Sequence, residues 1–222
     1  MDNKTAPTPW SAARIMASTF GTLSGLGGIV HGIGEMLQGN VSTSGIIINS
    51  WTQGPIATNM GGEPAMTILP NVLAAGIAAF ILSAAAIVWS IGFVHRKHGG
   101  LVLILLSIAM LLAGAGFAPP ILGILAGAAG LGIHAHKWWG NRLPINFQQF
   151  LAKSWPWIYG ICLINLVFLV VGSLVLVSLV GLNNPNLFVA SFLFAIVSCL
   201  ASIFTGAAYD VRKGYRVLTR SP

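Results

Sequence analysis

Five stretches of this chain, each 16 to 25 residues long, contain no Asp, Glu, Lys or Arg. A transmembrane helix needs about 20 predominantly apolar residues to cross a hydrocarbon core about 30 Å thick, so each stretch is close to the length of one span. A sixth stretch, residues 17–37, is glycine-rich and has Glu35 as its only charged residue. We therefore predict an all-α, polytopic integral membrane protein, in which residues 1–222 form a single transmembrane domain of six transmembrane helices. The predicted spans are residues 17–37, 70–94, 101–117, 121–136, 157–180 and 187–208.

The composition of the whole chain supports this class. Only 7% of its residues are charged and 55% are hydrophobic, whereas charged residues make up about 25% of ordinary soluble domains. The first apolar stretch is long, rich in glycine and without a clear small-residue cleavage site, so we expect a retained span rather than a signal peptide.

The third predicted span and most of the fourth lie within residues 99–133, which carry no charge over 35 positions. A single helix of that length would measure about 52 Å, far more than one crossing requires. Pro119 and Pro120 divide this stretch, because proline cannot continue the helical hydrogen bonds and disfavours helix at the residue before it. We therefore expect two spans joined by a tight turn.

The lysines and arginines predict the orientation. With six spans and a cytoplasmic N-terminus, the four cytoplasmic segments carry two, two, three and four of the 11 basic residues, and the outer loops carry none. Positive residues accumulate on the cytoplasmic side of membrane proteins, so both N- and C-termini are expected there. The short loops favour a multi-pass protein of the plasma membrane. This topology also accounts for the net charge of +7 without a nucleic-acid partner; the expected partner is the lipid bilayer.

Two connections are longer than turns. The outer loop, residues 38–67, has no basic residue and carries Glu63, which favours cations over anions at the outer mouth. Its composition does not decide between a short hairpin and a segment lying on the surface. The inner segment, residues 137–156, places Phe147, Phe150 and Leu151 on one helical face, which predicts a short amphipathic helix in the membrane interface.

The first span carries the most unusual pattern in the chain. At 100° per residue, four glycines and Glu35 share one face of a helix, and Ser24 and His31 lie at its edge. These glycines are Gly21, Gly25, Gly28 and Gly32. Small residues let helices approach closely in lipid, so one interpretation is a packing face. The other is an intramembrane site formed by Ser24, His31 and Glu35, because ionisable residues in a span usually face the interior of the bundle.

A similar glycine spacing recurs in the fourth span, where Gly123, Gly127 and Gly130 share one face. Halves of three spans with opposite orientation are common among transporters, so an inverted repeat is one explanation and simple packing is the other.

Little else in the sequence predicts chemistry. There are four acidic residues and no pair with the spacing of a two-carboxylate site, no phosphate-binding glycine loop and no catalytic-triad signature, so we do not predict an enzyme or a cofactor. His95, His98 and His134 are weak candidates for haem or metal ligands, against the simpler interpretation that they flank helix ends. Cys162 and Cys199 fall inside predicted spans, where small apolar packing residues are favoured over a disulfide.

Three functions follow from these observations. The first is a structural or accessory subunit whose glycine faces pack against a second copy or a membrane partner. The second is a transporter or permeation module for a small solute or ion that uses the polar face of the first helix. The third is a haem- or metal-binding membrane protein.

Overall fold

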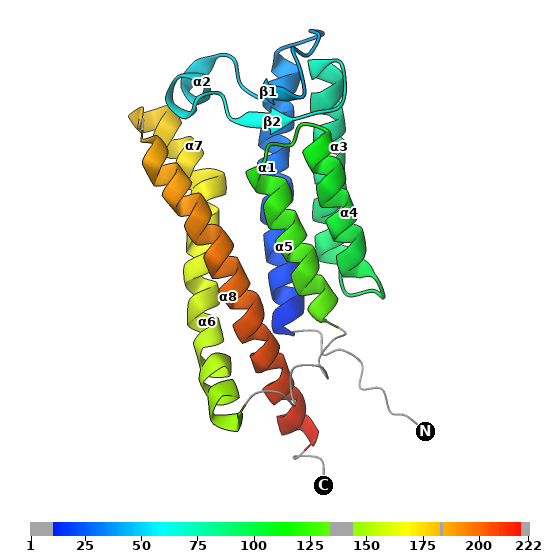
Figure 1. Ribbon diagram of the computed structural model, residues 1–222, viewed down its shortest axis with the longest axis vertical. Coiled ribbons are helices and arrows are strands. Elements are labelled where there is room, and N and C mark those ends of the chain that lie inside the picture. Colours follow the sequence, from blue (N-terminus) through cyan, green and yellow to red (C-terminus); the bar gives the residue numbers. More distant parts are fainter. Residues whose placement is uncertain (1–10, 134–143, 183, 219–222) are drawn as a thin grey trace.

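A computed structural model describes residues 11–133, 144–182 and 184–218, and these residues are mostly helical (Figure 1). The elements follow one another as α1 (Ala12–Leu37), β1 (Ile47–Asn49), α2 (Gly54–Met60), β2 (Pro64–Met66), α3 (Val72–Gly92), α4 (Gly99–Leu112), α5 (Ala118–Gly132), α6 (Ile145–Val167), the π-helical turn η1 (Phe168–Gly172), α7 (Ser173–Val175), a second π-helical turn η2 (Leu176–Val180), and α8 (Pro185–Leu218).

Three helical segments are long and apolar enough to cross a membrane: Val72–Gly92, Ile145–Val180 and Pro185–Lys213. The helices α4 and α5 are apolar but have only 14 and 15 residues, about 21–23 Å at 1.5 Å per residue. The helix α1 has 26 residues, but its glycines, serines and threonines keep it outside this group. The predicted helical class, with helices suited to a membrane, is confirmed. The six-span arrangement and the side of the termini stay predictions.

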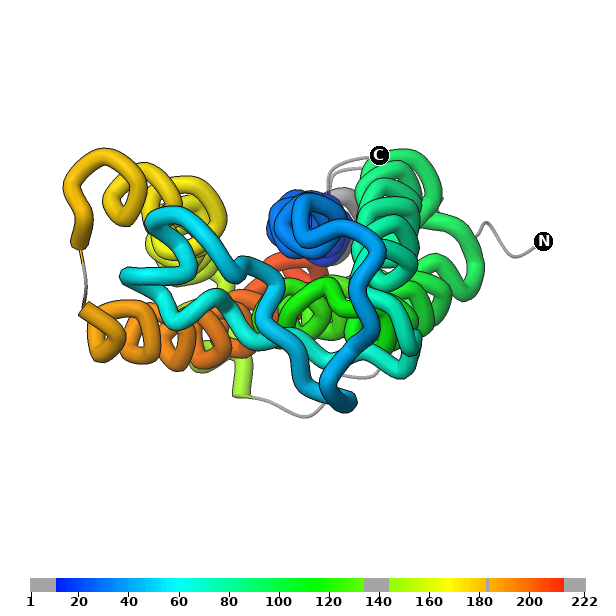
Figure 2. Tube along the Cα trace, turned by 90° about the horizontal axis from the view of Figure 1, so that it is seen from above, coloured from blue at the N-terminus to red at the C-terminus, as the bar shows by residue number. Residues whose placement is uncertain are grey.

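The long helices divide into two groups that lie side by side. The first group contains α1, α3, α4 and α5, and the second is the pair formed by α8 and the continuous helical run from α6 to η2. Figure 2, seen from above, places α1 between α3 and the second group.

The first group is held together by close backbone contacts. A Cβ at Gly32 would lie 2.8 Å from the Gly76 carbonyl oxygen, and a Cβ at Gly76 would lie 2.7 Å from that of Gly32, so α1 and α3 meet backbone to backbone. Gly127 of α5 meets Gly100 of α4 in the same way, with a Cβ 2.7 Å from the Gly100 carbonyl oxygen. Such contacts give van der Waals packing that larger residues would prevent.

The outer loop folds over one end of this group. The strands β1 and β2 pair antiparallel, with Ile48 opposite Ala65, and α2 connects them. Thr67, which follows β2, bridges to Ala113 in the turn between α4 and α5. The loop is therefore a hairpin fixed to the end of the bundle.

Several boundaries differ from the predicted spans. The helix α1 begins at Ala12 rather than at residue 17, and α8 continues to Leu218 rather than ending at residue 208. The helix α4 ends at Leu112 rather than at Phe117, because Gly114 and Gly116 adopt left-handed backbone conformations, with φ of 109° and 73°, before the two prolines are reached. The inner segment does not contain a separate helix among its described residues. From Ile145 onward it is the start of α6, which passes through Pro156 without ending.

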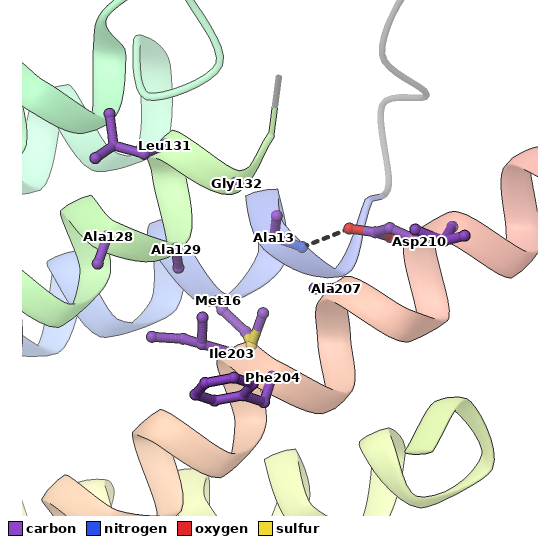
Figure 3. A pocket seen from close by; sticks show the side chains of 11 residues that line it. Ala13, Met16, Ala128, Ala129, Leu131, Gly132, Ile203, Phe204, Ala207 and Asp210 are labelled. Atoms are coloured by element: carbon purple, nitrogen blue, oxygen red, sulfur yellow. Dashed lines mark hydrogen bonds between the residues drawn. The ribbon is translucent and has the colours of Figure 1, made fainter. Parts of the chain in front are cut away.

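The opposite end of the bundle joins the two groups through Asp210 of α8. Its carboxylate accepts hydrogen bonds from the backbone N–H groups of Ala12 (2.6 Å) and Ala13 (3.0 Å) at the start of α1, and Figure 3 shows the second of these. The first N–H groups of a helix have no partner within the helix, so a buried carboxylate there acts as a cap.

Candidate functional site

Four polar side chains form a connected chain beneath the outer hairpin. The Oγ of Ser50 lies 3.1 Å from Oε1 of Glu35 and 2.8 Å from Nδ1 of His31. The other ring nitrogen of His31, Nε2, lies 3.5 Å from Oε2 of Glu63. We call Glu35, Ser50, His31 and Glu63 the outer polar chain.

The helix α1 supplies two of these groups. His31 and Glu35 are four residues apart, so they lie on one face of the helix, one turn above the other. Both are buried, with 7% of His31 and none of Glu35 exposed. The sequence predicted both as a candidate site, and the structure joins them through a hydroxyl that the sequence did not indicate.

Ser50 is held against α1 by contacts of its backbone. The Gln38 side chain, at the end of α1, donates to the carbonyl oxygens of Asn49 (3.0 Å) and Ser50 (2.8 Å). A Cβ at Gly34 would lie 2.5 Å from the Ser50 carbonyl oxygen, so the absence of a side chain there lets the hairpin approach the helix.

Glu63 owes its position to an unusual backbone. Gly61, Gly62 and Glu63 are all left-handed, with φ of 65°, 82° and 52°. This conformation costs a non-glycine residue about 1–2 kcal/mol. The Glu63 carbonyl accepts the N–H of Ser50 at 3.1 Å, which fixes both loop residues of the outer polar chain relative to each other. Strained residues of this kind gather at functional sites, where the surrounding structure holds them in place.

The turn between α4 and α5 closes the site on its remaining side. A Cβ at Gly114 would lie 2.5 Å from Oε2 of Glu35, and a Cβ at Gly116 would meet the His31 ring. Both positions therefore require glycine, because the backbone has a positive φ and a Cβ would collide with the Glu35 or His31 side chain.

Glu35 and Glu63 are the carboxylic acids at the two ends of the outer polar chain. Oε2 of Glu35 is buried and has no hydrogen-bond partner among the described residues, and a charged carboxylate in that position would be poorly compensated. The Ser50 hydroxyl donates to Oε1 of Glu35, and the donor and acceptor roles of the two His31 ring nitrogens follow from the tautomer of the ring. At the other end, Glu63 faces Nε2 of His31.

Glu63, the carboxylic acid of the outer polar chain that lies outside the predicted spans, titrates near neutral pH. Its side chain is 21% exposed, and burial raises the pKa of Glu63 from its usual value of 4.5 to about 7. Above pH 7 Glu63 therefore carries a negative charge beside Nε2 of His31.

His31 and Glu63 lie at one end of a cavity of about 330 Å³ between the two helix groups. The rest of its wall is almost entirely apolar and comes from α1, α5, the α6–α7 run and α8. Its lining includes Leu23, Val30, Leu122, Leu169 and Phe192. We call this the outer cavity. An apolar wall with a few convergent polar groups is typical of small-molecule sites.

A second cavity, of about 250 Å³, lies between the same two groups at their other end (Figure 3). Ala13 and Met16 of α1, Ala129 of α5 and Phe204 of α8 line it, and Asp210 is at its edge. Its wall is also mainly apolar.

The other candidate residues lie elsewhere. Ser24 is buried, but its hydroxyl donates to the Pro119 carbonyl oxygen at 2.6 Å and takes no part in the outer polar chain. Gly21, Gly25, Gly28 and Gly32 pack against α3, and Gly123, Gly127 and Gly130 pack against α4.

The histidine candidates for a metal do not gather into a site among the described residues. His95 and His98 lie in the turn between α3 and α4, where His98 precedes the first residue of α4. His134 lies outside the described residues. Within 11–133, 144–182 and 184–218, no three His, Cys, Asp or Glu side chains are grouped as a metal ion would require.

Sequence reasoning did not place Ser50 or Glu63 in a site with His31 and Glu35, although it noted the charge of Glu63 in the outer loop. Glu63 follows two glycines, which indicate a turn with left-handed backbone conformations. They do not indicate that the turn brings the Glu63 side chain to His31. Ser50 carries no signal in the sequence, because only the folded hairpin brings it to His31.

Comparison of the chain with protein-family models, with curated proteins and with solved structures gives no match. The function is therefore inferred from the geometry of this site.

Proposed function

We propose that this is a six-span protein of the plasma membrane with both termini in the cytoplasm. The beginning of α1, the turn between α3 and α4, the beginning of α6 and the end of α8 lie at one end of the bundle (Figure 1). All of the described basic residues are in these four places. They are Arg14, Arg96, Lys97, Lys153, Arg212, Lys213 and Arg216. The outer hairpin, at the opposite end, has none, and this distribution supports a cytoplasmic location for the basic end.

We further propose that the protein binds and transports small amphipathic cations, with Glu63 as the residue at which the cation and a proton compete. The observation that carries this proposal is that an almost wholly apolar cavity ends at the carboxylate of Glu63 and the ring of His31. The apolar body of such a molecule fits the wall formed by α1, α5, α6–α7 and α8. Its positive group then lies against Glu63.

Charge selection follows from the same groups. A carboxylate in a partly buried, apolar surrounding attracts a cation more strongly than it would in water. The outer hairpin adds no lysine or arginine that would repel the cation. Glu63 must be ionised to bind a cation, and its pKa is about 7. Each cation bound at pH 7 therefore releases about half a proton on average.

The proposal is tested with three probes that share a phenylbutyl body and differ in the head group. They are (4-phenylbutyl)trimethylammonium, 4-phenylbutanol and 4-phenylbutyrate. Calorimetry on the protein in nanodiscs at pH 8, with empty nanodiscs subtracted, should rank their affinity in that order. Glu63→Gln should remove the preference for the cation and leave the alcohol nearly unchanged. Equal affinities for the cation and the carboxylate would refute the proposal.

Transport is tested separately in proteoliposomes with the same trimethylammonium probe, whose charge does not change with pH. Uptake should depend on Glu63 and on a pH difference across the membrane. Binding without uptake would support the cation-binding site and refute the proposed transport function.

A structural or accessory subunit would need a surface for its partner. The glycine faces of α1 and α5 do not supply one, because they pack against α3 and α4 of the same chain. A partner would have to use other surfaces.

A further inference from the structure

Cys162 of α6 and Cys199 of α8 face each other inside the second helix group. Their sulfur atoms are 3.4 Å apart, both thiols are free, and neither residue is exposed. A disulfide has an S–S length of about 2.05 Å, so the sulfurs need to approach by roughly 1.4 Å to form one. Two cysteines that serve only as apolar packing have no need of this direct contact.

Access to this pair is from the apolar side. Cys199 belongs to the wall of the outer cavity, and the rest of that wall near it comes from aliphatic and aromatic side chains. A charged, water-soluble oxidant would have to lose its hydration to arrive there, which is costly. An apolar oxidant dissolved in the lipid pays no such cost.

We propose that Cys162 and Cys199 are a redox-active dithiol that a lipid-soluble quinone oxidises to an intramembrane disulfide between α6 and α8. The two thiols lose two protons and two electrons, one S–S bond forms, and the quinone takes up both protons and both electrons to become a hydroquinone. The disulfide links the two helices that form one wall of the outer cavity. Neither cysteine contacts His31 or Glu63 in the outer polar chain, so this inference and the proposed cation binding can fail separately.

The experiment uses the reduced, full-length protein in nanodiscs with decylubiquinone as the lipid-soluble oxidant and tetrathionate as the water-soluble one. Thiols are counted by alkylation in denaturant followed by intact mass. We expect decylubiquinone to remove both thiols from a monomeric chain with one hydroquinone formed per protein. Tetrathionate at the same concentration should react at least tenfold more slowly.

Cys162→Ser and Cys199→Ser serve as matched controls. Each keeps one thiol, and we expect each to remain fully alkylated and to form no hydroquinone. Size-exclusion chromatography checks that both variants are folded. The inference is overturned if both thiols of the unmodified chain persist after excess quinone, if the bond forms between two chains, or if tetrathionate reacts as fast as the quinone.

Discussion

The two sides of helix α1 are packed in opposite ways. Toward α3 its glycines leave no space, and the backbones of Gly32 and Gly76 are in direct contact. Toward α6 and α8 the same helix borders two cavities, of about 330 and 250 Å³. The difference indicates a fixed four-helix body and a more loosely joined helix pair. In the function proposed above, binding and any movement that accompanies it would take place on the side of α1 that faces α6 and α8.

The largest effect is expected on the tight side. Gly76→Ala places a Cβ 2.7 Å from the Gly32 carbonyl oxygen, so α1 and α3 must move apart. We expect a loss of about 1–3 kcal/mol of stability, measured by thermal unfolding in nanodiscs. Gly160→Ala is the matched control, because a Cβ at Gly160 meets nothing within 4 Å and alanine favours helix. Equal stability of the two variants would contradict a close backbone contact between α1 and α3 at Gly76.

The second prediction concerns the join between the two sides. Asp210→Ala removes the carboxylate that accepts from Ala12 and Ala13 at the start of α1. Losing a helix N-terminal cap costs about 0.5–2 kcal/mol. We expect a fall in the unfolding temperature together with faster hydrogen exchange at the first turn of α1. Unchanged hydrogen exchange at the first turn of α1 would show that Asp210 does not stabilise the contact between α1 and α8.

The third prediction is a pH-dependent effect on the loose side. Folding raises the pKa of Glu63 from 4.5 to about 7, so the folded state disfavours the ionised form. The resulting cost is absent below pH 4.5, grows as the pH rises to 7, and is constant above it. Glu63→Gln removes this cost, so the variant should match the unmodified protein at pH 4.5 and unfold at a higher temperature at pH 8. A variant that is less stable at pH 8 would contradict this assignment.

Much of the tight side could be predicted from the sequence. Glycines at helical spacing in α1 and in α5 are local signals, and the structure puts each of them against a neighbouring helix. The loose side could be predicted only in part. His31 and Glu35 are four residues apart on one helix and were recognisable as a pair. Ser50 and Glu63 reach them through pairing of β1 with β2, which a helical pattern does not encode.

Two further differences have local causes. Ser24 shares the polar edge of α1 with His31, but it lies toward Pro119, whose carbonyl oxygen takes its hydrogen bond. The early end of α4 depends on two left-handed glycines, which apolar periodicity does not detect.

The central claim is that an ionised Glu63 holds a cation at the end of the outer cavity. Its most direct test is the affinity of (4-phenylbutyl)trimethylammonium measured by calorimetry between pH 6 and pH 8, in the unmodified protein and in Glu63→Gln. Because only the protein titrates in this range and the pKa of Glu63 is about 7, binding should be roughly tenfold weaker at pH 6 than at pH 8. The Glu63→Gln variant should bind weakly and equally at both pH values. An affinity that does not change with pH in the unmodified protein would contradict the account.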